Sequence, residues 1–129
     1  MYKILSSILL FSMVACNQGG NMQNLIVFAD AVGTYTGTCI ANTPSSLDTF
    51  PSEISIFAIT IDKAGIKGDC LNNEWSVNVL NANGQEIDFE GYISDLTCNA
   101  TFYAANDSIF INVSNNQNQT VLSFSGTLE

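Results

Sequence analysis

The sequence predicts an all-β protein, a small up-and-down meander barrel of about eight short antiparallel strands. Three features of the chain support this fold class. Apolar and polar residues alternate over short runs, which places the apolar side chains on one face of a half-buried strand. Clusters of Asn, Gly, Asp and Ser interrupt these runs at intervals of roughly 8 to 12 residues, as in sandwiches and barrels. The pattern contains no amphipathic helix of useful length. Short sequential connections favour the meander, and closure into a barrel removes sheet edges that promote aggregation.

The expected strands follow one another with only short connections. In chain order they cover residues 33–41, 52–62, 66–71, the two arms of a hairpin within 75–93, 96–104, 108–114 and 120–128. The first run places Tyr35 and Cys39 on the face opposite to its threonines. The clearest unit is the hairpin, in which "NANG" at 81–84 supplies residues that tolerate the positive φ of a tight turn. Trp75 and Phe89 alternate with polar residues on its two arms.

The second and third runs are less regular than the others. Residues 52–62 are rich in isoleucine, but the apolar positions change parity within the run. This change indicates either a β-bulge near Phe57 and Ala58 or a strand that is buried on both faces. The Ala-Gly pair at 64–65 is expected to turn the chain into the short strand at 66–71.

The N-terminal segment has the layout of a secretory signal. Lys3 precedes an apolar run, and a small residue, Ala15, precedes Cys16. The run is too short for a transmembrane helix, which needs about 20 residues. A buried N-terminal strand or helix is the alternative, but the flanking lysine and the polar residues 17–24 fit export better.

The sequence "MVAC" at 13–16 resembles the lipobox of bacterial lipoproteins, in which a peptidase cuts before a diacylated cysteine. The resemblance implies that Cys16 carries lipid and anchors the protein to a membrane of the bacterial cell envelope. Each buried acyl CH₂ contributes about 0.8 kcal/mol, so that two or more chains anchor a protein stably. The expected organisation is a signal peptide over 1–15, the lipidated cysteine and a flexible tether over 16–24, and a barrel domain over 25–129.

The remaining cysteines are expected to be structural. Cys39, Cys70 and Cys98 would lie outside the cytoplasm, where disulfides persist. Three cysteines allow one disulfide and one leftover thiol, and all three pairings remain open. All three residues fall on strand faces that we expect to point inward. A metal site is not expected, because the chain has no His and no CxxC motif.

The charge balance excludes some classes of partner. The chain has 12 acidic residues against three lysines and a formal net charge of −9. Nucleic-acid binding requires cations that replace the phosphate counterions, so we exclude that class. Contact with anionic lipid head groups is disfavoured for the same reason. The acidity keeps an exported protein soluble, and it would attract a basic protein partner.

Catalytic residues are not evident in the sequence. Without His, a Ser or Cys nucleophile would need Lys63 or Lys67 as its base, and neither lies in a recognisable motif. Asp88 and Glu90 share one strand face and could act as paired carboxylates, or bind Ca²⁺ together with Asp95. A solvated outer strand face is the simpler expectation for them. The chain is therefore not expected to be an enzyme or to carry a cofactor or metal.

The first and last strands carry a second resemblance. "VGTYTGT" at 32–38 and "LSFSGTL" at 122–128 frame a meander that resembles the calycin-like, or lipocalin-like, small lipoproteins of bacteria. The resemblance implies a barrel that holds a small apolar ligand. Aromatic residues that alternate inward are candidates for the wall of such a site, and we single out Tyr35, Trp75 and Phe89.

The function expected from these observations is that of a non-enzymatic envelope lipoprotein that binds a small apolar molecule. Two alternatives remain open. One is a protein-binding lipoprotein, for example an inhibitor of a basic host or cell-wall enzyme, and the other is a structural envelope protein. An interior hollow above about 300 Å³ would favour the carrier, and a filled interior would favour the other two.

Overall fold

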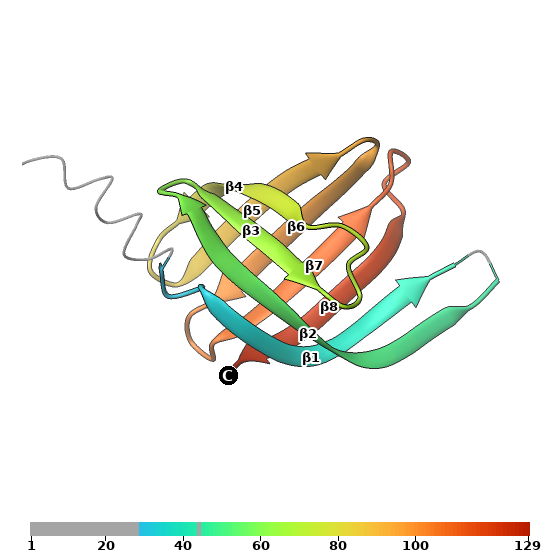
Figure 1. The fold of residues 1–129 in the computed structure, drawn as a ribbon, viewed down its shortest axis with the longest axis horizontal. Helices are drawn as coiled ribbons and strands as arrows, with labels where there is room; N and C mark the ends of the chain where they lie inside the picture. Colours follow the sequence, from blue (N-terminus) through green and yellow to red (C-terminus); the bar gives the residue numbers. More distant parts are fainter. Residues whose placement is uncertain (1–28, 44) are drawn as a thin grey trace, which may run out of the picture.

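A computed structural model describes residues 29–43 and 45–129. These residues form a closed barrel of eight antiparallel strands, in which each strand pairs with its neighbours in sequence and β8 pairs with β1 (Figure 1). The strands are β1 Gly33–Asn42, β2 Leu47–Thr60, β3 Lys63–Gly68, β4 Trp75–Ala82, β5 Glu86–Ile93, β6 Leu96–Tyr103, β7 Ser108–Ser114 and β8 Thr120–Leu128. The predicted all-β, up-and-down barrel is therefore confirmed. The expected signal peptide at 1–15 and the lipidated cysteine and tether at 16–24 lie outside the described residues.

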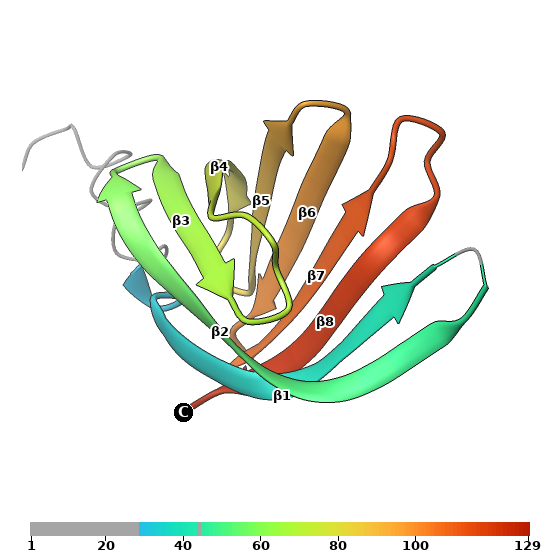
Figure 2. The ribbon, with the colours of Figure 1, turned by 45° about the vertical axis from the view of Figure 1, so that its right-hand side comes forward.

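The barrel has two ends, which we call the base and the mouth. The base contains the connections at 61–62, 83–85 and 104–107, together with residues 29–32 and Glu129. The mouth contains the other four connections, at 43–46, 69–74, 94–95 and 115–119. On the mouth side, the far halves of β1 and β2 project as a hairpin beyond the neighbouring strands (Figure 2). The two ends therefore differ in the lengths of their strands and connections.

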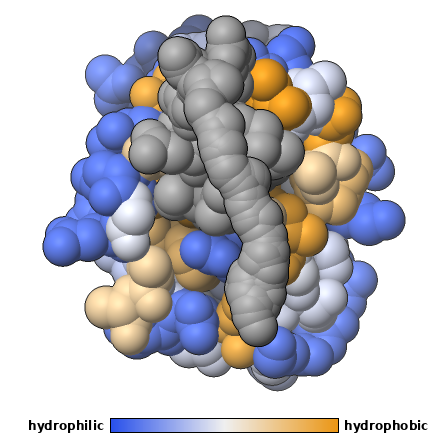
Figure 3. All heavy atoms as spheres, turned by 90° about the vertical axis from the view of Figure 1, so that its left-hand side faces the viewer, coloured by the Kyte–Doolittle hydropathy of each residue, from blue (hydrophilic) through white to orange (hydrophobic). Residues whose placement is uncertain are grey.

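The surface of the base is mixed in character. Figure 3 looks onto this end, where hydrophobic and hydrophilic side chains both reach the surface. The exposed apolar side chains near this end include Val32, Ile59 and Ile61. Carboxylates also lie here, on Asp62 and Asp107 in two of the turns.

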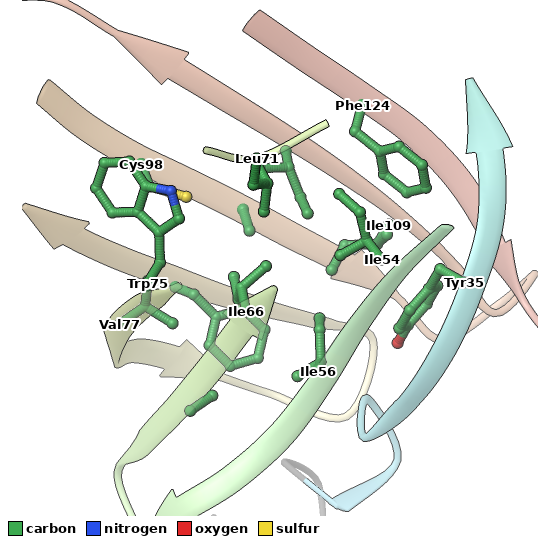
Figure 4. Packing of buried hydrophobic residues seen from close by; sticks show 14 of the residues in the cluster. Tyr35, Ile54, Ile56, Ile66, Leu71, Trp75, Val77, Cys98, Ile109 and Phe124 are labelled. Carbon is green, nitrogen blue, oxygen red and sulfur yellow. The ribbon is translucent and has the colours of Figure 1, made fainter. Parts of the chain in front are cut away.

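The core fills the barrel with the inward-facing side chain of every second residue. Each strand contributes at least one side chain that is almost fully buried: Tyr35, Ile54, Ile66, Val77, Phe89, Phe102, Ile111 and Phe124. Figure 4 shows part of this core, including Tyr35, Ile66 and Phe124. Tyr35 and Phe102 meet edge to face, with their ring centres 6.3 Å apart. Burying a side chain of this size contributes about 1.5–3 kcal/mol. The alternation read from the sequence is thus the alternation of inside and outside in the barrel.

The barrel closes where β1 meets β8, and glycines make this seam possible. Gly37 of β1 lies opposite Gly126 of β8 in the antiparallel register. A Cβ on Gly37 would lie 1.9 Å from the backbone oxygen of Ser125, and one on Gly126 would lie 2.6 Å from the ring of Phe124. No side chain fits at either position. The two motifs on which the calycin-like resemblance rests are therefore the two sides of one seam.

The predicted turn at 64–65 is wrong. The chain reverses at 61–62, and β3 begins at Lys63 rather than at residue 66. The hydroxyl of Thr60 donates a hydrogen bond to the carboxylate of Asp62 at 2.8 Å, which stabilises the earlier turn. Gly65 lies within β3, opposite Phe57 of β2, and the ring of Phe57 covers it. A Cβ at this position would lie 2.1 Å from that ring, so only glycine fits. The glycine reflects close packing and not a turn.

The expected irregularity in the second run is a β-bulge. The register between β2 and β3 shifts between Ala58 and Thr60, slightly later than the predicted position. Ile54 and Ile56 point into the core before the bulge. Ile59 is 48% exposed, so this end of the strand is not buried on both faces. The β4–β5 hairpin is confirmed, and Gly84 in its turn adopts a φ of +87°.

Candidate functional site

The 69–74 connection folds across the mouth and is fixed there by a disulfide. Cys70 is bonded to Cys39 of β1, and their Cα atoms are 6.5 Å apart. The backbone N–H of Leu71 donates to the carbonyl of Gly68 at 3.1 Å, which forms a tight turn directly after β3. Among the described cysteines, Cys98 is left free and is buried on β6. Of the three disulfide pairings that the sequence left open, the structure contains Cys39–Cys70. Cys70 lies in this connection and not in the strand that we predicted over 66–71.

A hollow of about 260 Å³ lies at the mouth beside this connection. Its apolar walls come from the connection and from the mouth ends of β4, β6, β7 and β8. These wall residues are Leu71, Trp75, Leu96, Val113, Val121 and Leu122. Polar side chains from the β1–β2 hairpin and from the 69–74 connection lie around them. These polar residues are Asn42, Thr43, Asn72 and Asn73.

The chemistry of this hollow is neutral. None of the described residues that line it carries a charge. Amide side chains both donate and accept hydrogen bonds, so they can orient the polar end of a bound group. Ligand pockets commonly begin at about 300 Å³, so this hollow is small. It fits a short alkyl chain or a single ring better than a whole lipid.

The three aromatic residues that we proposed as ligand walls lie in different parts of the barrel. Trp75 begins β4 and lines the hollow. Tyr35 lies nearer the base, where its hydroxyl donates to the carbonyl of Ala31 at 2.6 Å. Burial, and secondarily the charge of Asp107, raises the pKa of this phenol. Phe89 is buried in β5 between Val79 of β4 and Ala100 of β6 in the register.

Most of the mouth residues are not evident from local pattern. The expected strands at 66–71 and 75–93 divide "CLNNEW" at 70–75 between them, and Leu96 and Leu122 fall within the expected strands at 96–104 and 120–128 with nothing that singles them out. One signal was present in the sequence. Leu71 stands between a cysteine and two asparagines, which is an unusual place for a large apolar side chain in a surface loop.

The carboxylates considered for catalysis or calcium binding lie on the outside of the barrel. A carboxylate oxygen of Asp88 accepts a hydrogen bond from Thr101 at 2.9 Å. A hydrogen bond with Glu90 raises the pKa of the exposed Tyr92. Asp95 lies in the β5–β6 turn at the mouth. Within residues 29–43 and 45–129, no group of three or more His, Cys, Asp or Glu side chains is placed to hold a metal ion.

The two lysines in the described part of the chain lie on β3. Lys63 begins this strand at the base, and the ammonium of Lys67 lies 5.4 Å from the ring centre of Phe57, in a cation–π contact. The part of the chain that the structure describes contains no helix that is long and apolar enough to span a membrane.

No protein-family model and no curated protein matches this sequence. Fold and site therefore define the class: a small closed up-and-down β-barrel with a neutral apolar hollow at one end.

Proposed function

We propose that this protein is a non-enzymatic envelope lipoprotein, anchored by lipid on Cys16, that binds a small apolar group at the mouth of its barrel. The observation that carries the binding proposal is the neutral hollow, whose apolar walls are rimmed by amides under a connection held by the Cys39–Cys70 disulfide. The anchoring proposal depends on the resemblance of 13–16 to a lipobox.

The size of the hollow limits what it takes up. About 260 Å³ is too small for a long acyl chain, and the side chains of the core fill the barrel below the mouth. We therefore favour a short apolar group, such as a medium alkyl chain or one ring, that remains partly accessible. The interior is filled and the hollow lies below the roughly 300 Å³ that would have favoured a carrier, so the binding proposal depends on the apolar, neutral lining of the mouth alone.

The orientation of the barrel supports a binding end that faces away from the anchor. The described chain begins at residue 29, in the base, whereas the hollow lies at the mouth. A tether from Cys16 would therefore reach the barrel at the end opposite to the hollow. Such an arrangement suits a ligand that arrives from the aqueous side.

The chain supplies its own reporter for the binding test, because its single tryptophan, Trp75, lines the hollow. A chain without residues 1–15 and with Cys16→Ser leaves every described residue intact. We expect 8-bromo-1-octanol to quench its tryptophan fluorescence in a saturable manner, because bromine quenches an indole that it contacts. Leu122→Asn, which places an amide in the apolar wall, should weaken binding at least tenfold.

The matched control is Leu80→Asn, because Leu80 is an exposed leucine of β4 outside the hollow. This variant should bind the alcohol as the parent chain does. Quenching that rises linearly without saturation, or that is equal in both variants, would contradict the proposed mouth site.

Anchoring is tested separately by labelling cells with radioactive palmitate. The wild-type chain should incorporate the label, and the Cys16→Ala chain should not. Equal labelling of the two chains, or no labelling of either, would contradict the anchor and would leave the mouth experiment unaffected.

A further inference from the structure

The two halves of β2 are paired differently. Residues from Ile54 to Ile56 pair with both β1 and β3, and residues from Phe57 to Thr60 pair with β3. Residues from Leu47 to Glu53 pair with β1 on one side, and on the other side no strand of the described chain, residues 29–43 and 45–129, pairs with them. Figure 2 shows this half of β2 in the projecting hairpin. We call Leu47–Pro51 on the unpaired side the free edge.

The free edge exists because β3 is shorter than β2, and at the end of β3 the chain turns away from β2. The last pair between these strands is Ile54 with Gly68. Directly afterwards, the chain turns at Gly68, and the disulfide from Cys70 to Cys39 holds it over the mouth. A longer β3 would have covered the edge. The disulfide that shapes the hollow thus also keeps β2 uncovered.

The register identifies the backbone groups that face outward. Thr43 and Ser46 exchange both of their backbone hydrogen bonds, at 2.9 and 3.3 Å. Because hydrogen-bonded and non-hydrogen-bonded pairs alternate along an antiparallel ladder, Leu47, Thr49 and Pro51 direct their backbone groups away from β1.

The hydrogen bonds at the other end of the β1–β2 ladder give the same assignment of inward-facing and outward-facing backbone groups. The N–H of Glu129 donates to the carbonyl of Thr34, so Thr34 faces β8 and its neighbour Tyr35 faces β2. Since proline has no N–H, the free edge offers N–H donors on Leu47 and Thr49 and carbonyl acceptors on Leu47, Thr49 and Pro51.

The surroundings of the free edge are acidic and partly apolar. Asp48 and Glu53 are exposed on the same half of β2, and Asp69 is exposed just after the last residue of β3. Leu47 is 63% exposed and Phe50 is 38% exposed. Of the lysines of the described chain, Lys63 lies at the base, and Lys67 lies opposite Ser55 with its ammonium 5.4 Å from the ring centre of Phe57.

We propose that the free edge of β2 binds an extended cationic segment of a partner protein by strand addition. Main-chain hydrogen bonds supply the affinity in this mode of recognition, and side chains on alternate positions supply the specificity. Here Asp48 and Glu53 select positive charge, and the exposed Leu47 and Phe50 add apolar contact.

A second copy of the chain is a poorer occupant. Each chain carries a formal net charge of −9, so two copies repel each other. Pro51 also removes one N–H from each of the two edges that would pair. The proposal concerns a different partner and a different surface from the mouth hollow, so the two can fail independently.

The test uses the full chain in neutral detergent micelles and a fluorescein-labelled octapeptide in which pairs of lysine alternate with pairs of valine, so that lysines lie on both faces of the added strand. Fluorescence anisotropy should show saturable binding that weakens as salt is added. The corresponding peptide with glutamate in place of lysine should bind at least tenfold more weakly. No saturable binding of the lysine peptide up to millimolar concentration, or equal binding of both peptides, would overturn the proposal.

The decisive variants are Thr49→Pro and Thr49→Val. The N–H of Thr49 does not bond to β1, so proline there should leave the hairpin paired, as the natural Pro51 does. Thr49→Pro should weaken peptide binding at least tenfold, whereas Thr49→Val, which keeps the N–H, should not change it. Equal binding by the two variants would overturn strand addition.

A second variant tests the electrostatic part without touching the backbone. Asp48→Asn combined with Glu53→Gln should weaken lysine-peptide binding several-fold and reduce its salt dependence. Unchanged affinity would overturn the selection of positive charge. Reversible dimerisation of the wild-type chain in sedimentation experiments, abolished by Thr49→Pro, would assign the edge to a second copy and overturn the proposed occupant.

Discussion

The base and the mouth are built from the same eight strands, but they are closed in different ways. At the base, backbone hydrogen bonds tie the end of β8 to its neighbours: the N–H of Leu128 donates to the carbonyl of Asp107 at 2.7 Å, and the N–H of Glu129 donates to the carbonyl of Thr34 at 2.9 Å. At the mouth, β2 extends past β3, and one disulfide with a few apolar side chains covers what remains. At the mouth, the mismatch between the ends of β2 and β3 leaves both a hollow and an edge.

The largest expected effect compares a core residue on the base side with a residue of the mouth. Phe102 is fully buried, so Phe102→Ala should lower the free energy of unfolding by about 3–5 kcal/mol. Leu71 already borders a hollow, so Leu71→Ala should cost less, about 2 kcal/mol. Urea unfolding of both variants measures the two values. A larger loss for Leu71→Ala would reverse the proposed difference between the two ends.

The disulfide should be the main source of stability at the mouth. It joins residues 31 positions apart, and cross-links of that span contribute about 3–4 kcal/mol. Replacing Cys39 and Cys70 together by alanine should lower the unfolding free energy by this amount and speed amide exchange in the 69–74 connection. Cys98→Ala, which keeps the disulfide, is the control. An unchanged exchange rate in the double variant would show that packing alone holds the connection.

Stability should fall in alkaline solution. Burial raises the pKa of the Cys98 thiol from 9.0 to about 12. The folded state therefore holds this proton more tightly than the unfolded state. The stabilisation is complete below about pH 9 and is lost as the pH rises toward 12, by up to about 1.4 kcal/mol per pH unit.

Urea unfolding at pH 8, 9, 10 and 11 measures this dependence. Cys98→Ala should flatten it between about pH 9 and 10. Above pH 10 a slope of the same sign should remain, because burial also raises the pKa of Tyr35. The same slope in the variant and the wild type between pH 9 and 10 would contradict the role given to Cys98.

The smallest effect concerns a single hydrogen bond at the base. Tyr35→Phe removes the bond to the carbonyl of Ala31 and leaves that carbonyl without this donor, which should cost about 1 kcal/mol. Quenching of Trp75 by 8-bromo-1-octanol should be unchanged, because Tyr35 does not line the hollow. Weaker quenching in this variant would mean that the base and the mouth are coupled.

Local patterns predicted the fold class well. Alternation placed Tyr35, Trp75 and Phe89 on inward faces, and the spacing of turn residues indicated a meander. The predicted turn at 64–65 failed because a glycine can mark either a turn or a close contact within a strand. Gly65 suggested a turn, but it is small because an aromatic ring covers it within a strand.

The candidate site was largely beyond local prediction. Of the three aromatic residues singled out from the sequence, Trp75 lines the hollow, whereas Tyr35 and Phe89 belong to the filled core. Leu96 and Leu122 lie far apart in the chain and meet only because β6 and β8 end at the same side of the barrel.

The sequence by itself determined that the chain forms an antiparallel meander with one apolar face, because apolar and polar residues alternate in each short run. It also limited the cysteines beyond residue 16 to one bridge and one thiol. Only the tertiary structure decided that Cys39 pairs with Cys70, that a hollow opens at the mouth and that half of β2 is paired on one side only. These outcomes depend on strand register and on where each strand ends in the closed barrel, and no single run of residues contains that information.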